Sequence, residues 1–155
     1  MLQPVKKTKA GKTRGTFAIV ASRYNARYVD GMLNAAAAEL KRTGAKVQII
    51  RVPGAYEIPV VAAKLASQLR ATRPAAIICL GVILRGETTH AQHIGEAVSQ
   101  ALMQIQIQHG VPVIHEVLLL ENEKQATARC LNPKHNRGVE AAQTALEMAR
   151  VMASL

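Results

Sequence analysis

The sequence predicts an α/β fold in which a parallel sheet is packed between two layers of helices. Short apolar runs alternate with segments of helical periodicity along the chain. The apolar runs lack the polar alternation of half-exposed strands, which is typical of a parallel sheet buried on both faces. No linker or low-complexity segment divides the chain after its first residues. We therefore expect a three-layer α/β/α sandwich built on four parallel strands.

The composition supports a single domain with a core of small aliphatic side chains. The chain has 155 residues, which is long enough for one domain with a substantial core. Hydrophobic residues make up 49% of the sequence, whereas aromatic residues make up only 3% and Trp is absent. Ala, Val, Ile and Leu must therefore fill the interior, as is usual where helices pack on a parallel sheet.

The individual elements follow from local patterns in chain order. The predicted strands are Thr16–Ser22, Lys46–Val52, 75–84 and 111–120. The first predicted helix lies between its cap, Asn25, and the glycine that ends it, Gly44. The other predicted helices cover 58–69, 90–108, 121–130 and 138–154. Pro59 fits the first turn of its helix, and Gly110 ends the long one. This alternation of strands and helices is flavodoxin-like.

The start of the chain is strongly basic. The formal net charge is +10, and five basic residues precede the first apolar run: Lys6, Lys7, Lys9, Lys12 and Arg14. We interpret residues 1–14 as a basic tail and 15–155 as a single α/β domain. The tail is either a solvated arm, which is the simpler interpretation, or a dedicated binding element.

The charge and the cysteines limit the classes of function. A basic surface suits phosphates and also nucleic acid. The scarcity of aromatic residues and of a basic recognition helix argues against nucleic acid as the main partner, except non-specifically. Cys79 and Cys130 indicate neither a disulfide framework nor a zinc site. No apolar run approaches the roughly 20 residues that span a bilayer, and no apolar signal core is present, so we expect a cytoplasmic protein without membrane contact.

The chemically useful residues gather in the loops after the predicted strands. In open α/β sheets, ligands bind beyond the carboxyl ends of the strands. These loops are 23–25, 53–57, 85–90 and 119–123. In the third loop, Gly86, Thr88 and Thr89 precede the long helix, and this combination favours an anion site. His90 begins that helix and is suited to proton transfer, although an ordinary capping turn with a solvated histidine remains the alternative.

Other candidates have two interpretations each. Tyr24 and Tyr56 are suited to stacking on a flat heterocycle, or they simply cover the edge of the core. Glu57 is suited to binding ligand hydroxyls or to serving as a helix-dipole partner. Either Arg129 or Arg137 can clamp a phosphate, or both are ordinary surface arginines.

A metal site and a nucleotide site are both disfavoured. His90 and His93 lie three residues apart, with Glu87 and Glu96 nearby, but a single His-x-x-His without a third ligand cluster is weak evidence, so we expect no metal. The glycines match neither the dinucleotide fingerprint nor the P-loop.

Taken together, these loops resemble the lumazine synthase family over nearly the whole chain. The segments that carry the resemblance are 22–25 (SRYN), 52–59 (VPGAYEIP), 81–90 (GVILRGETTH), 110–113 (GVPV), 121–126 (ENEKQA), 136–138 (NRG) and 145–149 (ALEMA). Single tetrapeptides would mean little, but this many in the right order form a specific signal.

The resemblance implies an enzyme of riboflavin biosynthesis that works without a metal or organic cofactor. It would condense 5-amino-6-ribitylaminouracil with 3,4-dihydroxy-2-butanone 4-phosphate to 6,7-dimethyl-8-ribityllumazine, releasing phosphate and water. The family pattern makes His90 the catalytic proton-transfer residue, places Glu87 and Thr88 at the phosphate, and makes Arg129 its charged clamp. Tyr24 would stack on the pyrimidine. The remaining contacts are Ala55, Tyr56 and Glu57 for the ribityl chain, and the main chain of Val82, Ile83 and Leu84 for the pyrimidine edge.

The sequence departs from the family pattern at several positions. Tyr24 stands where Phe is common, and His115 stands where a neighbouring subunit usually contributes an aromatic ring to the pyrimidine. Arg137 replaces a usual Lys. Leu119–Leu120 replace threonines, and Cys130–Leu131 replace an Ala-Gly pair. Because of these changes, a lumazine- or flavin-binding or cargo-encapsulating homologue without turnover is the alternative function.

The resemblance also implies self-assembly. Sites in the family lie between neighbouring subunits of a pentamer, and pentamers remain single, pair into decamers, or close into an icosahedral shell of twelve. The connector 131–137 shows no insertion relative to the shell-forming pattern, which favours the shell. An N-terminal segment of a neighbouring subunit is expected to add a strand to the sheet. A riboflavin synthase is a further expected partner.

Overall fold

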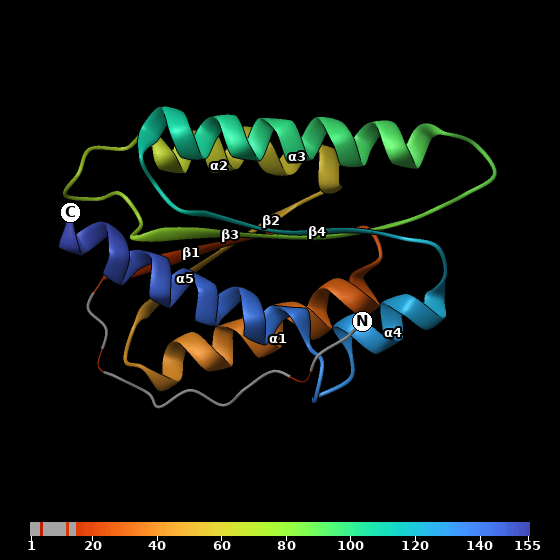
Figure 1. Ribbon diagram of the computed structural model, residues 1–155, viewed down its shortest axis with the longest axis horizontal. Coiled ribbons are helices and arrows are strands. Elements are labelled where there is room, and N and C mark those ends of the chain that lie inside the picture. Colours follow the sequence, from red (N-terminus) through yellow and green to blue (C-terminus); the bar gives the residue numbers. More distant parts are fainter. Residues whose placement is uncertain (1–3, 5–11, 13–14) are drawn as a thin grey trace.

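The structure is a three-layer α/β/α sandwich, as the sequence predicts. This computed structural model describes residues 4, 12 and 15–155. Its strands are β1 (Thr16–Ser22), β2 (Lys46–Val52), β3 (Ala76–Leu84) and β4 (Val113–Leu120), all parallel, in the order β2-β1-β3-β4. Its helices are α1 (Ala26–Arg42), α2 (Ile58–Ala66), α3 (His90–His109), α4 (Glu123–Cys130) and α5 (Arg137–Ser154), with a 3-10 turn η1 (Ala55–Glu57) before α2. Figure 1 shows α2 and α3 on one face of the sheet, and α1, α4 and α5 on the other.

Two hydrophobic clusters, one on each face, form the core. Successive residues of β1 alternate between them: Phe17 and Ile19 pack with α1 and α5, whereas Ala18 and Val20 pack with α2 and α3. All four side chains are fully buried. The central strands are therefore apolar along their length because both of their faces are covered.

The predicted element boundaries are wrong by a few residues at three places. Helix α2 ends at Ala66 rather than at residue 69, and Leu69 is 82% exposed, so a longer helix would bury nothing more there. Strand β4 begins at Val113 rather than at residue 111, because Pro112 has no N–H to donate to a ladder. Helix α4 begins at Glu123 rather than at residue 121, since Asn122 caps it by accepting a hydrogen bond from the Gln125 amide at 3.0 Å.

Much of the predicted basic tail lies outside the described residues. The strand that the N-terminal segment of a neighbouring subunit is predicted to add also lies outside them. None of the helices in the described part is long and apolar enough to cross a membrane.

A close backbone contact joins α1, α4 and α5. A Cβ added to Gly138 would lie 2.0 Å from the Met32 carbonyl oxygen, and one added to Gly31 would lie 2.7 Å from the Cys130 carbonyl oxygen. Between these glycines, the buried Asn136 accepts a hydrogen bond from the Gly138 amide at 2.8 Å and donates to the Cys130 carbonyl at 2.7 Å. Asn136 therefore links the end of α4 to the start of α5, which fixes both helices against α1.

We expect Gly138→Ala to destabilise the fold, because its methyl group can be accommodated only by moving α5 away from the α1 backbone. The expected loss is about 3 kcal/mol of unfolding free energy, or roughly 10 °C in Tm. Gly95→Ala is the matched control, since its Cβ meets only the Leu119 side chain at 3.6 Å. Inside α3 this change should stabilise by about 0.5–1 kcal/mol. Thermal unfolding that places both variants on the same side of wild type would contradict this packing.

Candidate active site

A cavity of about 870 Å³ opens at the carboxyl ends of the strands. The strand order reverses between β1 and β3, so the loops that follow these strands diverge and leave a crevice there. Nine of the residues predicted for the site line this cavity: Tyr24, Ala55, Tyr56, Glu57, Val82, Ile83, Leu84, Thr88 and His90. Its volume lies within the range of small-molecule sites.

The loop after β1 forms one wall of the cavity and is tied to both neighbouring strands. The amide of Tyr24 donates to the Pro53 carbonyl at 3.0 Å, which joins this loop to the one after β2. Asn25 adopts a left-handed conformation, with φ 56°, and its side chain does not cap α1 as predicted. Its Nδ2 instead donates to the Val82 carbonyl at 2.7 Å. Asn25 also lines the cavity, so the sequence analysis found its position but not its role.

The aromatic side chains of this wall are open to the cavity and to solvent. Tyr24 is 74% exposed and Tyr56 is 64% exposed, so neither is needed to fill the core. This exposure favours the stacking interpretation over the core-covering one. Glu57 accepts a hydrogen bond from the Gly54 amide at 2.9 Å, and it thereby fixes η1 at the edge of the cavity.

The main chain of β3 faces the same cavity. The pairing of β3 with β1 ends at Leu80, whereas its pairing with β4 continues to Leu84. Residues 81–84 therefore have no strand partner on the β1 side. Asn25 engages the Val82 carbonyl there, and the remaining backbone groups on this side are available to a ligand. Unpaired backbone N–H and C=O groups in a cavity are strong hydrogen-bonding groups.

The start of α3 forms the far wall. Thr89 precedes the helix without a side-chain cap, and the first turn of α3 contains no acidic residue. The amide of His90 lies 3.4 Å from Thr88 Oγ1, a long hydrogen bond. Together with Gly86, this leaves a helix N-terminus open to an anion. His93, Ile94 and Ala97 also line the cavity. The sequence showed the spacing of His90 and His93 and raised a metal site, but the same helical spacing could have placed all three residues on the face of α3 that lines the cavity.

The other four predicted residues do not line this cavity. Glu87, His115, Arg129 and Arg137 lie outside it, and the described lining residues include no Lys or Arg. His115, Arg129 and Arg137 lie on β4 or on the helices that follow it, and β4 is an edge strand. The described lining of the cavity therefore contains two imidazole side chains and two tyrosine rings but no guanidinium or ammonium group.

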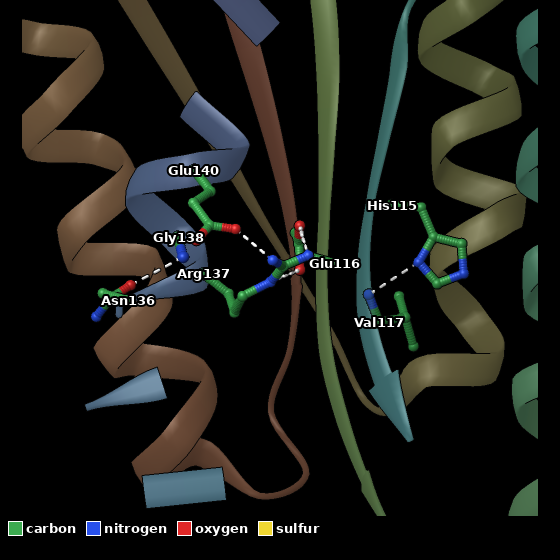
Figure 2. Close-up of polar contacts among 7 residues, drawn as sticks. All are labelled: His115, Glu116, Val117, Asn136, Arg137, Gly138 and Glu140. Atoms are coloured by element: carbon green, nitrogen blue, oxygen red, sulfur yellow. Dashed lines mark hydrogen bonds and ion pairs between the residues drawn. The ribbon is translucent and has the colours of Figure 1, made fainter. Parts of the chain in front are cut away.

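Arg137 is held by two carboxylates. Its Nε and Nη2 donate to Glu116 at 3.1 and 3.0 Å, and Nη1 pairs with Glu140 on the same helix. Figure 2 shows the guanidinium group between these two side chains. Burial of the Glu116 carboxyl group raises its pKa to about 7, although the charges of Arg137 and Arg129 oppose this shift. Every guanidinium nitrogen of Arg137 is thus engaged within the chain.

Arg129 differs from Arg137 in this respect. It lies half-buried in the last turn of α4, and within the described part of the chain it has no hydrogen bond or ion pair. Of the two predicted phosphate clamps, Arg129 is the one whose guanidinium group is not already engaged. No group of three or more His, Cys, Asp or Glu residues in the described ranges is arranged to hold a metal ion.

The fold and the cavity define an α/β protein with a small-molecule site at the switch point of a parallel sheet. A family model described as 6,7-dimethyl-8-ribityllumazine synthase matches residues 14–153. The chain is 42% identical over 142 residues to the 6,7-dimethyl-8-ribityllumazine synthase of Stenotrophomonas maltophilia, with 90% of each chain covered. It is 39% identical over 143 residues to that of Xanthomonas campestris pv. campestris, with 90% of this chain and 91% of the relative covered. The chain belongs to the 6,7-dimethyl-8-ribityllumazine synthase family, an enzyme family.

The raised pKa of Glu116 predicts a specific dependence of stability on pH. A carboxyl group whose pKa rises from 4.5 to about 7 on folding stabilises the fold below pH 4.5, and that stability is lost as the pH rises through 7. Glu116→Gln cannot ionise but can still accept a hydrogen bond from Arg137. Between pH 5 and pH 8, the assembled wild type should therefore lose about 1–3 kcal/mol more unfolding free energy than this variant.

Urea unfolding of both proteins at the two pH values measures this difference. Glu147→Gln is the matched control, because Glu147 pairs with Arg150 at the exposed surface of α5. Its pH dependence should equal that of wild type. Parallel curves for wild type and Glu116→Gln would contradict the raised pKa.

Proposed function

We propose that this protein condenses 5-amino-6-ribitylaminouracil with 3,4-dihydroxy-2-butanone 4-phosphate to form 6,7-dimethyl-8-ribityllumazine, releasing phosphate and water. It is then a transferase-type enzyme of riboflavin biosynthesis. The observation that carries the proposal is the cavity at the switch point, which brings the predicted stacking, ribityl-binding and proton-transfer residues together. Membership of the family supports the choice of reaction.

The pyrimidine substrate fits the wall formed by the first two loops and β3. The exposed ring of Tyr24 provides a stacking surface. Those main-chain groups of Val82–Leu84 that neither β4 nor Asn25 engages provide hydrogen-bonding groups for the edge of the heterocycle. Ala55, Tyr56 and Glu57 would bind the ribityl chain. The Glu57 carboxylate, which already accepts from the Gly54 amide, has acceptor capacity left for ribityl hydroxyl groups.

The chemistry requires several proton transfers. The amine attacks the ketone, an imine forms as water leaves, phosphate is eliminated, and the ring closes with loss of a second water. His90 lies at the start of α3 beside the anion site, where one imidazole can take up and return these protons in turn. Much of the remaining acceleration would come from holding two substrates in one cavity.

We propose that the phosphate binds at the start of α3, with the Arg129 guanidinium group of a neighbouring subunit as its clamp. The α3 N-terminus, Gly86 and the hydroxyl group of Thr88 favour an anion, and Glu87 would contribute through its backbone. A charged clamp is missing from the described lining residues of a single cavity, and Arg129 has no hydrogen-bond or ion-pair partner within the described chain. Arg137, engaged by Glu116 and Glu140, would mainly hold the α4–α5 connector in place.

The active assembly is proposed to be a pentamer, with the shell of twelve pentamers as the favoured larger form. Large apolar side chains are exposed on α2 and α3, where Val60 is 69%, Met103 is 55% and Ile107 is 74% exposed. Such a surface is typical of a subunit interface. Residues 15–155 would be the catalytic domain and 1–14 a basic arm, and a riboflavin synthase would use the product. Both cysteines are buried free thiols, which is compatible with a reducing cytoplasm.

Turnover of the two named substrates tests the reaction directly. We expect the wild type to form the lumazine and an equal amount of phosphate. The absorbance of the lumazine measures its formation. His90→Ala should reduce kcat by about 10²-fold or more, because it removes the proton shuttle. His109→Ala, at the other end of α3 and outside the cavity, is the matched control and should retain wild-type turnover.

The two outcomes separate enzyme from carrier. Tight binding of a ribityl ligand without product from the wild type would identify a non-catalytic binding homologue. If the wild type forms product and His90→Ala turns over at the same rate, the proposed reaction stands but His90 is not the proton-transfer residue.

Mixed assemblies test whether neighbouring subunits share a site. His90→Ala and Arg129→Ala subunits should each be nearly inactive alone. When they are unfolded together and reassembled at equal amounts, about one quarter of the interfaces would combine an intact His90 with an intact Arg129. We therefore expect about one quarter of the wild-type rate. A mixture as inactive as its components would show that both residues act within one chain, whereas an active Arg129→Ala protein would show that Arg129 is not the clamp.

A further inference from the structure

His115 lies on the open edge of the sheet, and both of its ring nitrogens have partners within the chain. The amide of Val117 points away from β3 and donates to His115 Nδ1 at 3.2 Å, a contact that Figure 2 shows. The Nε2 atom lies 2.7 Å from the hydroxyl oxygen of Ser99 on α3. The Ser99 hydroxyl is in turn 2.7 Å from the Gly95 carbonyl oxygen.

These contacts define the protonation state of the ring. A backbone amide can only donate, so Nδ1 must accept and carries no proton. A carbonyl can only accept, so the Ser99 hydroxyl group donates its proton to Gly95 and accepts at its oxygen. Nε2 must therefore be the donor to Ser99. The chain of contacts is satisfied by a neutral imidazole with its proton on Nε2 and by no other form.

Protonation of His115 would break this arrangement. A proton on Nδ1 would face the Val117 N–H, so that two donors would oppose each other. Burial independently lowers the pKa of His115. The charged groups along the adjoining groove between α3 and β4 are Arg85 and Glu96, which have opposite signs, while the directly paired residue of β3 is the buried thiol of Cys79. Glu116, the next residue of β4, points to the opposite face, where it binds Arg137.

We infer that Ser99 is a positioning residue, which holds His115 as an uncharged ring whose flat face is presented to the pyrimidine in a neighbouring subunit's site. The inference rests on the proposed function, in which His115 contributes to that site. Since both nitrogens are engaged inside the chain, only the ring face and its C–H edge remain for a ligand. His115 then acts as an aromatic stacking surface rather than as a hydrogen-bonding or acid–base group.

Steady-state kinetics across pH 5.5–8.5 test this inference on the assembled enzyme. The proteins are wild type, Ser99→Ala, Ser99→Thr, His115→Phe and the double variant with Ser99→Ala and His115→Phe. Ser99→Ala should raise KM for the ribitylaminouracil by roughly threefold to tenfold, with a smaller change in kcat. It should also move the acid limb of kcat/KM to higher pH, because a released ring can leave the Val117 amide and take up a proton.

The other variants separate positioning from a merely structural role. Ser99→Thr keeps the hydroxyl group and should restore both KM and the acid limb. His115→Phe should retain stacking and should lose the contribution of His115 to the acid limb. Because His90 also lies in the site, that contribution is measured as the difference between the wild-type and His115→Phe pH profiles. In that background Ser99→Ala should have no further effect. Ser154→Ala is the matched control, since this helix hydroxyl bonds only the Val151 carbonyl.

An equal effect of Ser99→Ala in the wild-type background and in the His115→Phe background would overturn the inference, as would an unchanged acid limb in Ser99→Ala. Absence of product from wild type would overturn the proposed function instead. The affinity of each variant for the ribitylaminouracil would then be measured over the same pH range. An affinity of Ser99→Ala equal to that of wild type would again overturn the inference.

Discussion

The reversal of strand order between β1 and β3 is the constraint on which the site depends. Because β2 lies on one side of β1 and β3 on the other, the loops after β1 and β3 lead to helices on opposite faces of the sheet. A crevice opens between them without any insertion in the chain. The hydrogen bond from Asn25 to the Val82 carbonyl spans this crevice at its base and fixes the separation of its walls.

A second consequence of the strand order concerns β4. This strand is at the edge of the described sheet, opposite to β2, and its outer backbone groups have no strand partner. His115 satisfies one of them, the Val117 amide, with its own side chain. Because this amide already has an acceptor, it is not available to another strand, which discourages unspecific pairing at the edge. The same contact leaves the ring at the surface, where a neighbouring subunit can meet it.

The sequence predicted the fold well because its signals are local. Strands β1 and β2 match their predicted bounds, since β1 is an apolar run and β2 is a short segment rich in Val and Ile, and neither signal needs distant information. The error at Pro112 has a local cause that a stricter use of proline would have found, whereas the exposure of Leu69 became visible only in the folded chain. The site residues came mainly from the family resemblance, and the topology alone indicated which loops would carry them.

The polar contacts that join side chains from different elements around the site were not predictable from local sequence signals. Asn25 and Val82 are 57 residues apart, Ser99 and His115 are 16 apart, and Glu116 and Arg137 are 21 apart. Each pair joins different elements, so its existence depends on the register of the sheet and on the helix packed against it. The residue patterns alone left Arg129 and Arg137 both open as a phosphate clamp, and the family resemblance favoured Arg129. The partners of Arg137, Glu116 and Glu140, became visible only in the folded chain.

The two faces of β4 explain how this chain accommodates its departures from the family pattern. On one face, Glu116 accepts two hydrogen bonds from the guanidinium group of Arg137 and anchors the start of α5, so that the larger side chain in place of Lys becomes part of the packing. On the other face, Ser99 accepts the hydrogen bond that the His115 ring donates, so that an imidazole takes the place of an apolar aromatic ring. In both cases a polar group that stands near the proposed shared site is satisfied from within its own subunit. For the half-buried Arg137, loss of such partners would cost about 1–3 kcal/mol. Arg129, which has no hydrogen bond or ion pair within the described chain, differs from both, and this difference is the reason for proposing it as the phosphate clamp.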